Sequence, residues 1–191
     1  MTRSRLALSF GEKLDLDLVV GDAPPPATGA VVVPQDVHLI LGEVGPLEDT
    51  RETPEQVLAA SAQDRPKKPG SIVVAPAREG SPLLVQAIVY DFDRTPPARE
   101  VHVFEALLAA FEEARTRGLR SVAVQPLGTA HAGLDPARFL GLLAQVCYSS
   151  AEMGTTLRRV HLLLPSPEEL VRYEVLLQTL VERRGGRKPS A

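Results

Sequence analysis

The sequence predicts a three-layer α/β fold, helix on sheet on helix, around a central mixed, mostly parallel sheet. In the second half of the chain, helical segments alternate with short apolar segments of strand length, which is typical of parallel strands joined by right-handed crossovers. The first half begins with strands alone, so the sheet should be mixed. Aromatic residues make up 4% of the chain and Trp is absent. Ala, Val and Leu must therefore build the core, which suits helices packed on a parallel sheet.

Two strands open the chain, Leu6–Phe10 and Leu14–Val20, and the second alternates Leu with Asp. The three prolines Pro24–Pro26 exclude a helix there. Ala30–Val33 is wholly apolar, as expected of a strand that is buried on both faces. The next segment, His38–Leu41, is ambiguous between a strand and a helical turn.

A helix is predicted to start at Thr53, because Thr53, Pro54 and Gln56 form a capping box with proline in the first helical position. It ends before the loop that begins at Pro66. Two further strands follow in the sequence, Ser71–Ala75 and Leu83–Tyr90.

The second half begins with a long helix, Arg99–Arg117, which Gly118 ends. Ser121–Gln125 is a central strand, and the small-residue loop Pro126–Leu134 follows it. Four apolar side chains at helical spacing predict the buried face of the long helix: Val101, Phe104, Leu108 and Phe111.

Asp135 caps the next helix, Leu157–Leu164 is the last strand, and a capping box at Ser166 opens a final helix that runs through Leu180. The helix after Asp135 is predicted to bury five apolar side chains: Phe139, Leu142, Leu143, Val146 and Cys147. We expect residues 1–182 to form one domain and 183–191 to form a flexible basic tail.

Composition limits the function classes. The single Cys147 excludes an internal disulfide framework and a Cys-based zinc site, and the histidines have no metal-ligand spacing. A formal net charge of -3 argues against broad binding to nucleic acid. Nothing predicts a secretory signal, a membrane span, a cofactor or a metal. We expect a soluble cytoplasmic protein and leave homo-oligomerisation open.

Four segments follow, in chain order, the pattern of a known family. Gly21-Asp22 follows the opening strands, Gly70–Ala75 and Leu84–Asp91 form a middle pair, and Gln125–Leu134 precedes a helix. In this order they resemble the macro domains, the family that binds ADP-ribose. The resemblance covers roughly residues 6–180 and implies a macro-domain-like fold.

The resemblance implies roles only for the residues that match the family's motifs. Asp22 stands where the family contacts adenine, and the matching glycine-loop positions, where the family cradles the diphosphate, are Gly42, Gly128, Thr129 and Gly133. The chain contains no Asn. It has Pro34-Gln35-Asp36-Val37 where the family has an Asn-Ala-Ala-Asn run, and Glu43 interrupts the family's glycine run.

Physical chemistry supports one of these loops as an anion site. Backbone amides of small residues can converge on a pyrophosphate, helped by a helix N-terminus. The alternative is a tight turn that needs glycine for its backbone alone. Glu43 would repel phosphates, and Asp22 could accept from adenine or cap the proline turn. The ligand-binding candidates of the second loop are Gly128, Thr129, Ala130, His131 and Gly133.

Three functions follow as hypotheses. The first is a non-catalytic module that weakly binds a nucleotide, an ADP-ribose-related ligand or another small anion. The second is an ADP-ribosyl hydrolase with substitute residues, for which Asp36 and His131 are weak catalytic candidates. The third is an interaction or scaffold domain that has kept the fold and lost the pocket.

Overall fold

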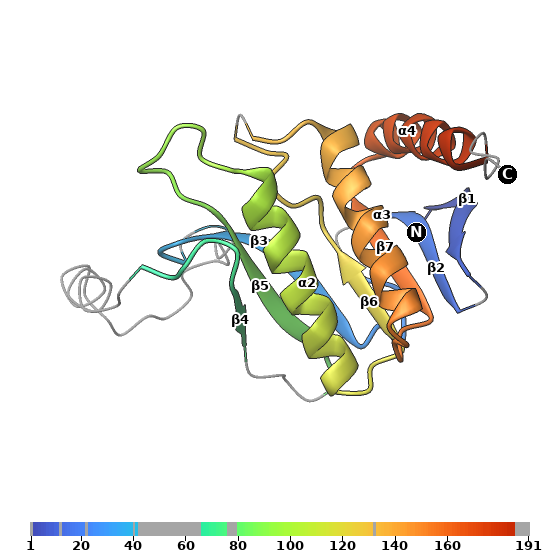
Figure 1. Ribbon diagram of the computed structural model, residues 1–191, viewed down its shortest axis with the longest axis horizontal. Coiled ribbons are helices and arrows are strands. Elements are labelled where there is room, and N and C mark those ends of the chain that lie inside the picture. Colours follow the sequence, from blue (N-terminus) through green and yellow to red (C-terminus); the bar gives the residue numbers. More distant parts are fainter. Residues whose placement is uncertain are drawn as a thin grey trace, which may run out of the picture.

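The computed structural model describes residues 2–11, 13–21, 23–39, 41, 66–75, 80–131 and 133–185. Its seven strands form one sheet in the order β1-β2-β7-β6-β3-β5-β4 (Figure 1). The two edge strands, β1 and β4, run antiparallel to their neighbours, and the strands between them are parallel. The predicted mixed, mostly parallel sheet is thus confirmed. The strands are β1 (Thr2–Phe10), β2 (Leu14–Val20), β3 (Ala30–Asp36), β4 (Ile72–Val74), β5 (Leu83–Tyr90), β6 (Ser121–Val124) and β7 (Arg159–Leu164).

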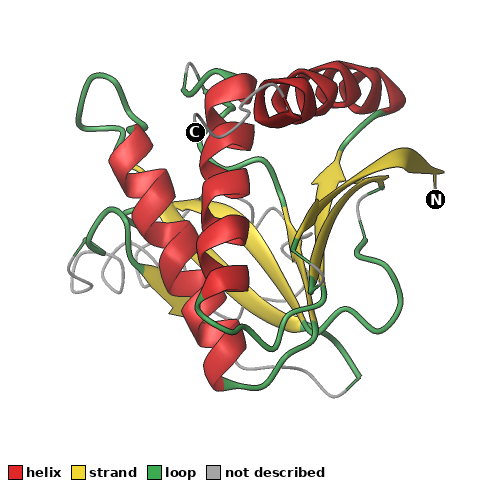
Figure 2. Cartoon of the chain, turned by 45° about the vertical axis from the view of Figure 1, so that its right-hand side comes forward, coloured by secondary structure: helices red, strands yellow, loops and turns green. Residues whose placement is uncertain are grey.

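Three helices lie in the described ranges: α2 (Glu100–Thr116), α3 (Pro136–Glu152) and α4 (Pro167–Gly185). Figure 2 shows α2 and α3 side by side across one face of the sheet. All three join the same hydrophobic core, which contains Leu16 of β2, Val32 of β3 and Val85 of β5. The helix predicted at Thr53 lies outside the described residues. None of the described helices has the length and hydropathy to cross a bilayer.

Two helix caps form as the sequence predicts. The Asp135 carboxylate accepts a hydrogen bond from the Ala137 amide at 2.7 Å, which fixes the start of α3. Ser166 Oγ accepts from the Glu169 amide at 3.3 Å at the start of α4. At its other end α4 continues to Gly185, three residues past the domain boundary expected at 182, and residues 186–191 lie outside the described ranges.

The predicted buried face of α2 is wrong in part. Val101 is 52% exposed, whereas Val103 and Leu107 are fully buried. Ala106, Ala110 and Ala114 are also buried, and such small side chains let α2 approach both β5 and α3 closely. In α3, likewise, Leu140 is fully buried, whereas the predicted Leu142 is only partly so.

The sheet opens at the carboxyl end of β3. On one side β3 pairs with β5 as far as Asp36, opposite Tyr90. On the other side its pairing with β6 stops at Val32, where the Gln125 amide donates to the Val32 carbonyl at 2.9 Å. Beyond that point the two chains separate. A parallel sheet characteristically binds ligands where neighbouring strands part in this way.

Candidate functional site

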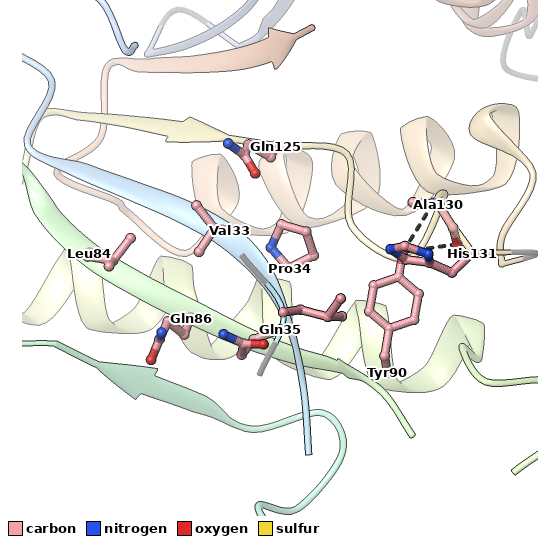
Figure 3. Close-up of a pocket in the computed structure, with 10 residues that line it drawn as sticks. Val33, Pro34, Gln35, Leu84, Gln86, Tyr90, Gln125, Ala130 and His131 are labelled. Atoms are coloured by element: carbon pink, nitrogen blue, oxygen red, sulfur yellow. Dashed lines mark hydrogen bonds between the residues drawn. The ribbon is translucent and has the colours of Figure 1, made fainter. Parts of the chain in front are cut away.

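A cavity of about 300 Å³ lies where β3 and the chain leaving β6 separate (Figure 3). Its floor is the sheet face opposite the described helices, because the floor residues alternate along β3 and β5 with core residues such as Val32 and Val85. Its rim, at the carboxyl end of the sheet, includes Tyr90 and the loop after β6. The described lining residues are Val33, Pro34, Gln35, Leu41, Leu84, Gln86, Tyr90, Gln125, Ala130 and His131.

The loop between β6 and α3, residues 125–135, is shaped by two glycines. Gly128 has φ +73, and a Cβ there would meet Val103 Cγ2 at 2.8 Å. A Cβ on Gly133 would collide with the Gly128 carbonyl oxygen. That oxygen also accepts from the Leu134 amide at 2.6 Å, so the loop folds back on itself. The tight-turn role of these glycines and an anion-binding role are therefore compatible.

Within the described ranges, some backbone amides of this loop donate a hydrogen bond and others do not. The Gly133 amide donates to the Ala130 carbonyl at 3.1 Å. Within the described ranges, the amides of Gly128, Thr129 and His131 have no hydrogen-bond acceptor. Unpaired amides carry a strong demand for a partner, so this loop can receive an anion or water.

The Tyr90 side chain is hydrogen-bonded to the backbone of Ala130 in the same loop. Its hydroxyl accepts from the Ala130 amide and donates to the Ala130 carbonyl, both at 3.1 Å; dashed lines mark the two contacts in Figure 3. The residue is 1% exposed. Burial raises the pKa of Tyr90, and the hydrogen bond with the Ala130 backbone opposes the rise in part. The hydroxyl therefore stays protonated and neutral.

Three aromatic rings gather at the rim. Tyr90 and Phe92 stack with ring centroids 5.5 Å apart and planes within 6°, and Phe92 is 51% exposed. His131 presents its ring edge-on to both, at 5.6 Å and 5.8 Å. A backbone φ of +55 turns His131 toward them. The rim thus offers an exposed aromatic surface and one imidazole.

The backbone amides of the loop after β3 donate hydrogen bonds to Asp36 and to Tyr90. The Asp36 carboxylate accepts from the His38 amide at 2.6 Å and from the Leu41 amide at 2.8 Å. The Leu39 amide donates to the Asp36 carbonyl, and the Val37 amide to the Tyr90 carbonyl. Asp36 thus organises a turn, which settles the His38–Leu41 ambiguity up to Leu39. Its catalytic role remains a prediction.

Three glutamines line the cavity, Gln35 of β3, Gln86 of β5 and Gln125 directly after β6, and sequence reasoning did not select them. Gln35 is 1% exposed; its Oε1 accepts from the Asp36 amide at 3.0 Å. In the described part of the chain, neither Gln35 Nε2 nor the side-chain amides of Gln86 and Gln125 make a hydrogen bond. Such side chains offer donors and acceptors without charge. The signal that could have found them is period-two alternation within apolar strands of a chain that lacks Asn.

The β6–α3 loop is also supported from α4. Tyr173 is fully buried, and its side chain hydrogen-bonds that of Thr129. Burial raises the pKa of Tyr173 to about 12, with the Glu169 carboxylate adding to the rise and the Thr129 hydrogen bond opposing it. The Thr129 side chain therefore supports the loop, and its backbone amide has no acceptor within the described ranges.

The other predicted site residues lie partly outside and partly inside the described ranges. Asp22, Gly42 and Glu43 lie outside the described residues. Of the others, the structure brings Ala130 and His131 to the cavity. Gly128, Thr129 and Gly133 form the loop behind them. In the described ranges no three His, Cys, Asp or Glu side chains group as metal ligands.

Comparison with known proteins is informative only at the level of structure. No family model matches the sequence. No curated protein matches it either. Solved structures do match: the chain superposes on an Oceanobacillus iheyensis macrodomain with ADP at a TM-score of 0.71 and 16% identity, covering 96% of this chain and 100% of that one.

Two further solved structures have the same fold. A Trypanosoma brucei macrodomain in complex with ADP-ribose gives a TM-score of 0.60 at 14% identity, over 86% of this chain and 68% of that one. The macrodomain of Thermus aquaticus DarG gives 0.55 at 19% identity, over 80% and 99%. The site thus lies in an α/β domain that opens at a strand switch point. That domain has the macrodomain fold, so the predicted fold class is confirmed.

Proposed function

We propose that this macrodomain-fold module weakly binds a nucleotide of the ADP-ribose class and does not act on it chemically. The observation that carries the proposal is the β6–α3 loop, which lines the cavity at Ala130 and His131 and in which the amides of His131 and, behind it, Gly128 and Thr129 have no acceptor within the described ranges. Main-chain amides bind a diphosphate without Lys or Arg. Support also comes from the matching structures, two of which are described with ADP and with ADP-ribose.

The cavity suits the uncharged part of such a ligand. Its described lining contains apolar side chains and three glutamines, with no carboxylate, lysine or arginine. Glutamine amides can hydrogen-bond hydroxyl groups in both directions, as sugar hydroxyls require. We therefore assign the phosphates to the loop and a sugar to the glutamine-lined floor.

Weak binding is expected because some backbone amides at the site already donate hydrogen bonds to protein acceptors. The Ala130 amide is held by Tyr90, and the β3-exit amides are held by Asp36. A ligand must displace these bonds or do without those donors. Each donor withheld from a phosphate forgoes a charge-assisted hydrogen bond, which is worth about 1.5–3 kcal/mol.

Thermal shift and calorimetry with ADP-ribose, ADP, AMP and pyrophosphate test the proposal. At ten times its Kd, ADP-ribose should stabilise the protein by about 1.4 kcal/mol and raise the Tm by about 3–5 °C. AMP and pyrophosphate should each do less at the same concentration. An equal effect of pyrophosphate and ADP-ribose would reduce the site to a simple anion site. No response to any ligand would favour the interaction-domain hypothesis.

One observation favours a second function, removal of ADP-ribose from a modified protein. His131 lines the cavity and is exposed, so it can reach a ligand as an acid or base. Asp36 is less suited, because both its carboxylate oxygens accept backbone hydrogen bonds. Turnover of mono-ADP-ribosylated protein that is lost in His131→Ala would establish this function. An inactive native chain would reject it.

A further inference from the structure

Tyr90 is tied to both loops that frame the cavity. Its carbonyl accepts from the Val37 amide at 3.0 Å, which joins β5 to the loop after β3. Forty residues along the chain, its hydroxyl reaches Ala130 in the loop after β6. A shift of the loop after β6 away from the hydroxyl therefore leaves the backbone link between β5 and the loop after β3 undisturbed.

The hydroxyl occupies the acceptor position of the Ala130 amide. It supplies a neutral oxygen to the Ala130 amide, while Gly128, Thr129 and His131 on the same loop have no acceptor within the described ranges. An anion bound across these amides would reach Ala130 as well, since successive main-chain amides converge on one anion. The phenol oxygen and a phosphate oxygen cannot both accept from that single N–H.

We propose that the Tyr90 hydroxyl is a built-in competitor for phosphate at the Ala130 amide and thereby sets the affinity of the site. The inference rests on the proposed function and adds its regulation. A ligand phosphate captures the Ala130 amide only when the loop after β6 shifts and that amide leaves the phenol oxygen, which is fixed to the buried ring. Tyr90 is thus a positioning residue, which acts through the loop amide and not through chemistry on a ligand.

The geometry permits this exchange. Ala130 is exposed, so its backbone groups can pass from the phenol to water or to a ligand. The Ala130 carbonyl keeps a second donor, the Gly133 amide at 3.1 Å, when it leaves the hydroxyl. The Tyr90 ring, and with it the phenol oxygen, stays stacked on Phe92, so the exposed Ala130 backbone is the part that moves. Only two neutral hydrogen bonds have to be exchanged.

Tyr90→Phe tests the inference, with Tyr148→Phe as the matched control. The first substitution removes the competing hydroxyl and keeps the stacked ring. The second removes a hydroxyl from a half-exposed tyrosine of α3 that lies outside the cavity. By calorimetry, Tyr90→Phe should bind inorganic pyrophosphate and ADP-ribose about fivefold more tightly, the factor for one net hydrogen bond. Tyr148→Phe should bind like the native chain.

Amide exchange measured by NMR provides the second readout. In Tyr90→Phe the Ala130 amide should exchange faster without ligand, and pyrophosphate should protect it. In the native chain, pyrophosphate should shift the Tyr90 ring resonances as the Ala130 amide leaves the hydroxyl, a readout that does not need the variant. Unchanged or weaker binding by Tyr90→Phe would overturn the inference, as would tighter binding without protection of Ala130.

The outcomes separate the inference from the proposed function. If pyrophosphate gains affinity in Tyr90→Phe but ADP-ribose binds no better than pyrophosphate, the competitor role stands and the nucleotide function fails. If ADP-ribose binds the native chain and Tyr90→Phe equally, the function stands and the competitor role fails.

Discussion

Two loops leave neighbouring strands at the same end of the sheet and differ in whether their backbone amides have hydrogen-bond acceptors. After β3, the Asp36 carboxylate accepts from the amides of His38 and Leu41. After β6, two closely packed glycines shape the loop, and the amides of Gly128, Thr129 and His131 find no acceptor in the described part of the chain. The first loop contains its own anion. The second leaves these amides without an acceptor in the described ranges.

The difference shows that two loops at the same end of the sheet can differ in how many backbone amides are left for a ligand. A carboxylate inside a loop satisfies the donors that a ligand would use and repels a second negative charge. Glycine has no side chain with which to do so. We therefore expect the β6–α3 loop to carry the anion and the β3-exit loop to serve as a rigid wall.

Gly133→Ala should have the largest effect, because the new Cβ collides with the Gly128 carbonyl oxygen. We expect a loss of about 3 kcal/mol in unfolding free energy, typical of forced overpacking, and no ADP-ribose binding. Gly141→Ala on α3, where a Cβ meets nothing within 4 Å, is the matched control. It should raise stability by about 0.5–1 kcal/mol and leave binding unchanged. Chemical denaturation measures both, and binding retained by Gly133→Ala would contradict the account.

Asp36→Ala should cost about 2 kcal/mol, because it removes the carboxylate from two backbone donors of the β3-exit loop. If Asp36 is an internal anion, added formate should restore part of the loss by binding the vacated amides. Asp93→Ala removes a carboxylate whose side chain is 86% exposed, and it should change stability by less than about 0.5 kcal/mol. Thermal denaturation with and without formate is the measurement. Full stability of Asp36→Ala would refute the internal-anion interpretation.

Tyr173→Phe should have the smallest effect: loss of the Thr129 hydrogen bond lowers stability by about 1 kcal/mol at every pH, and the remaining effect is confined to alkaline pH. The pKa of Tyr173 is raised to about 12 in the folded protein, from an ordinary value of 10.0. Between these values the unfolded phenol loses its proton and the folded phenol keeps it, so stability falls as pH rises. Tyr173→Phe should remove about 1 kcal/mol of that loss by pH 11. A Tm series from about pH 9 to pH 11 tests this, with Tyr148→Phe as the exposed control; identical curves for Tyr173→Phe and native protein would contradict it.

Much of the fold could be predicted from the sequence, because its signals are local. Alternating Leu and Asp residues mark β2, and Asp135 and Ser166 mark the starts of α3 and α4. The buried face of α2 could not be predicted correctly. Alanines next to Val103 and Leu107 decide which side approaches the sheet, and alanine contributes little to an apolar stripe.

Likewise, part of the candidate site could be predicted from the sequence and part could not. The glycine loop could be predicted, because positive φ and close backbone approach restrict Gly128 and Gly133 to glycine. Tyr90 could not be selected, because its hydroxyl finds Ala130 through the fold and not through nearby sequence. The three glutamines come together from β3, β5 and the residue after β6, and period-two alternation within apolar strands is the one local signal that could have found them.

An NMR titration of the native chain with ADP-ribose tests the central claim most directly, because it reports on the amides of both loops at once. The account predicts that the Thr129 and His131 amides shift and become protected from exchange, while those of His38 and Leu41 stay as they are. The opposite pattern, with His38 and Leu41 responding and the loop after β6 silent, would contradict it.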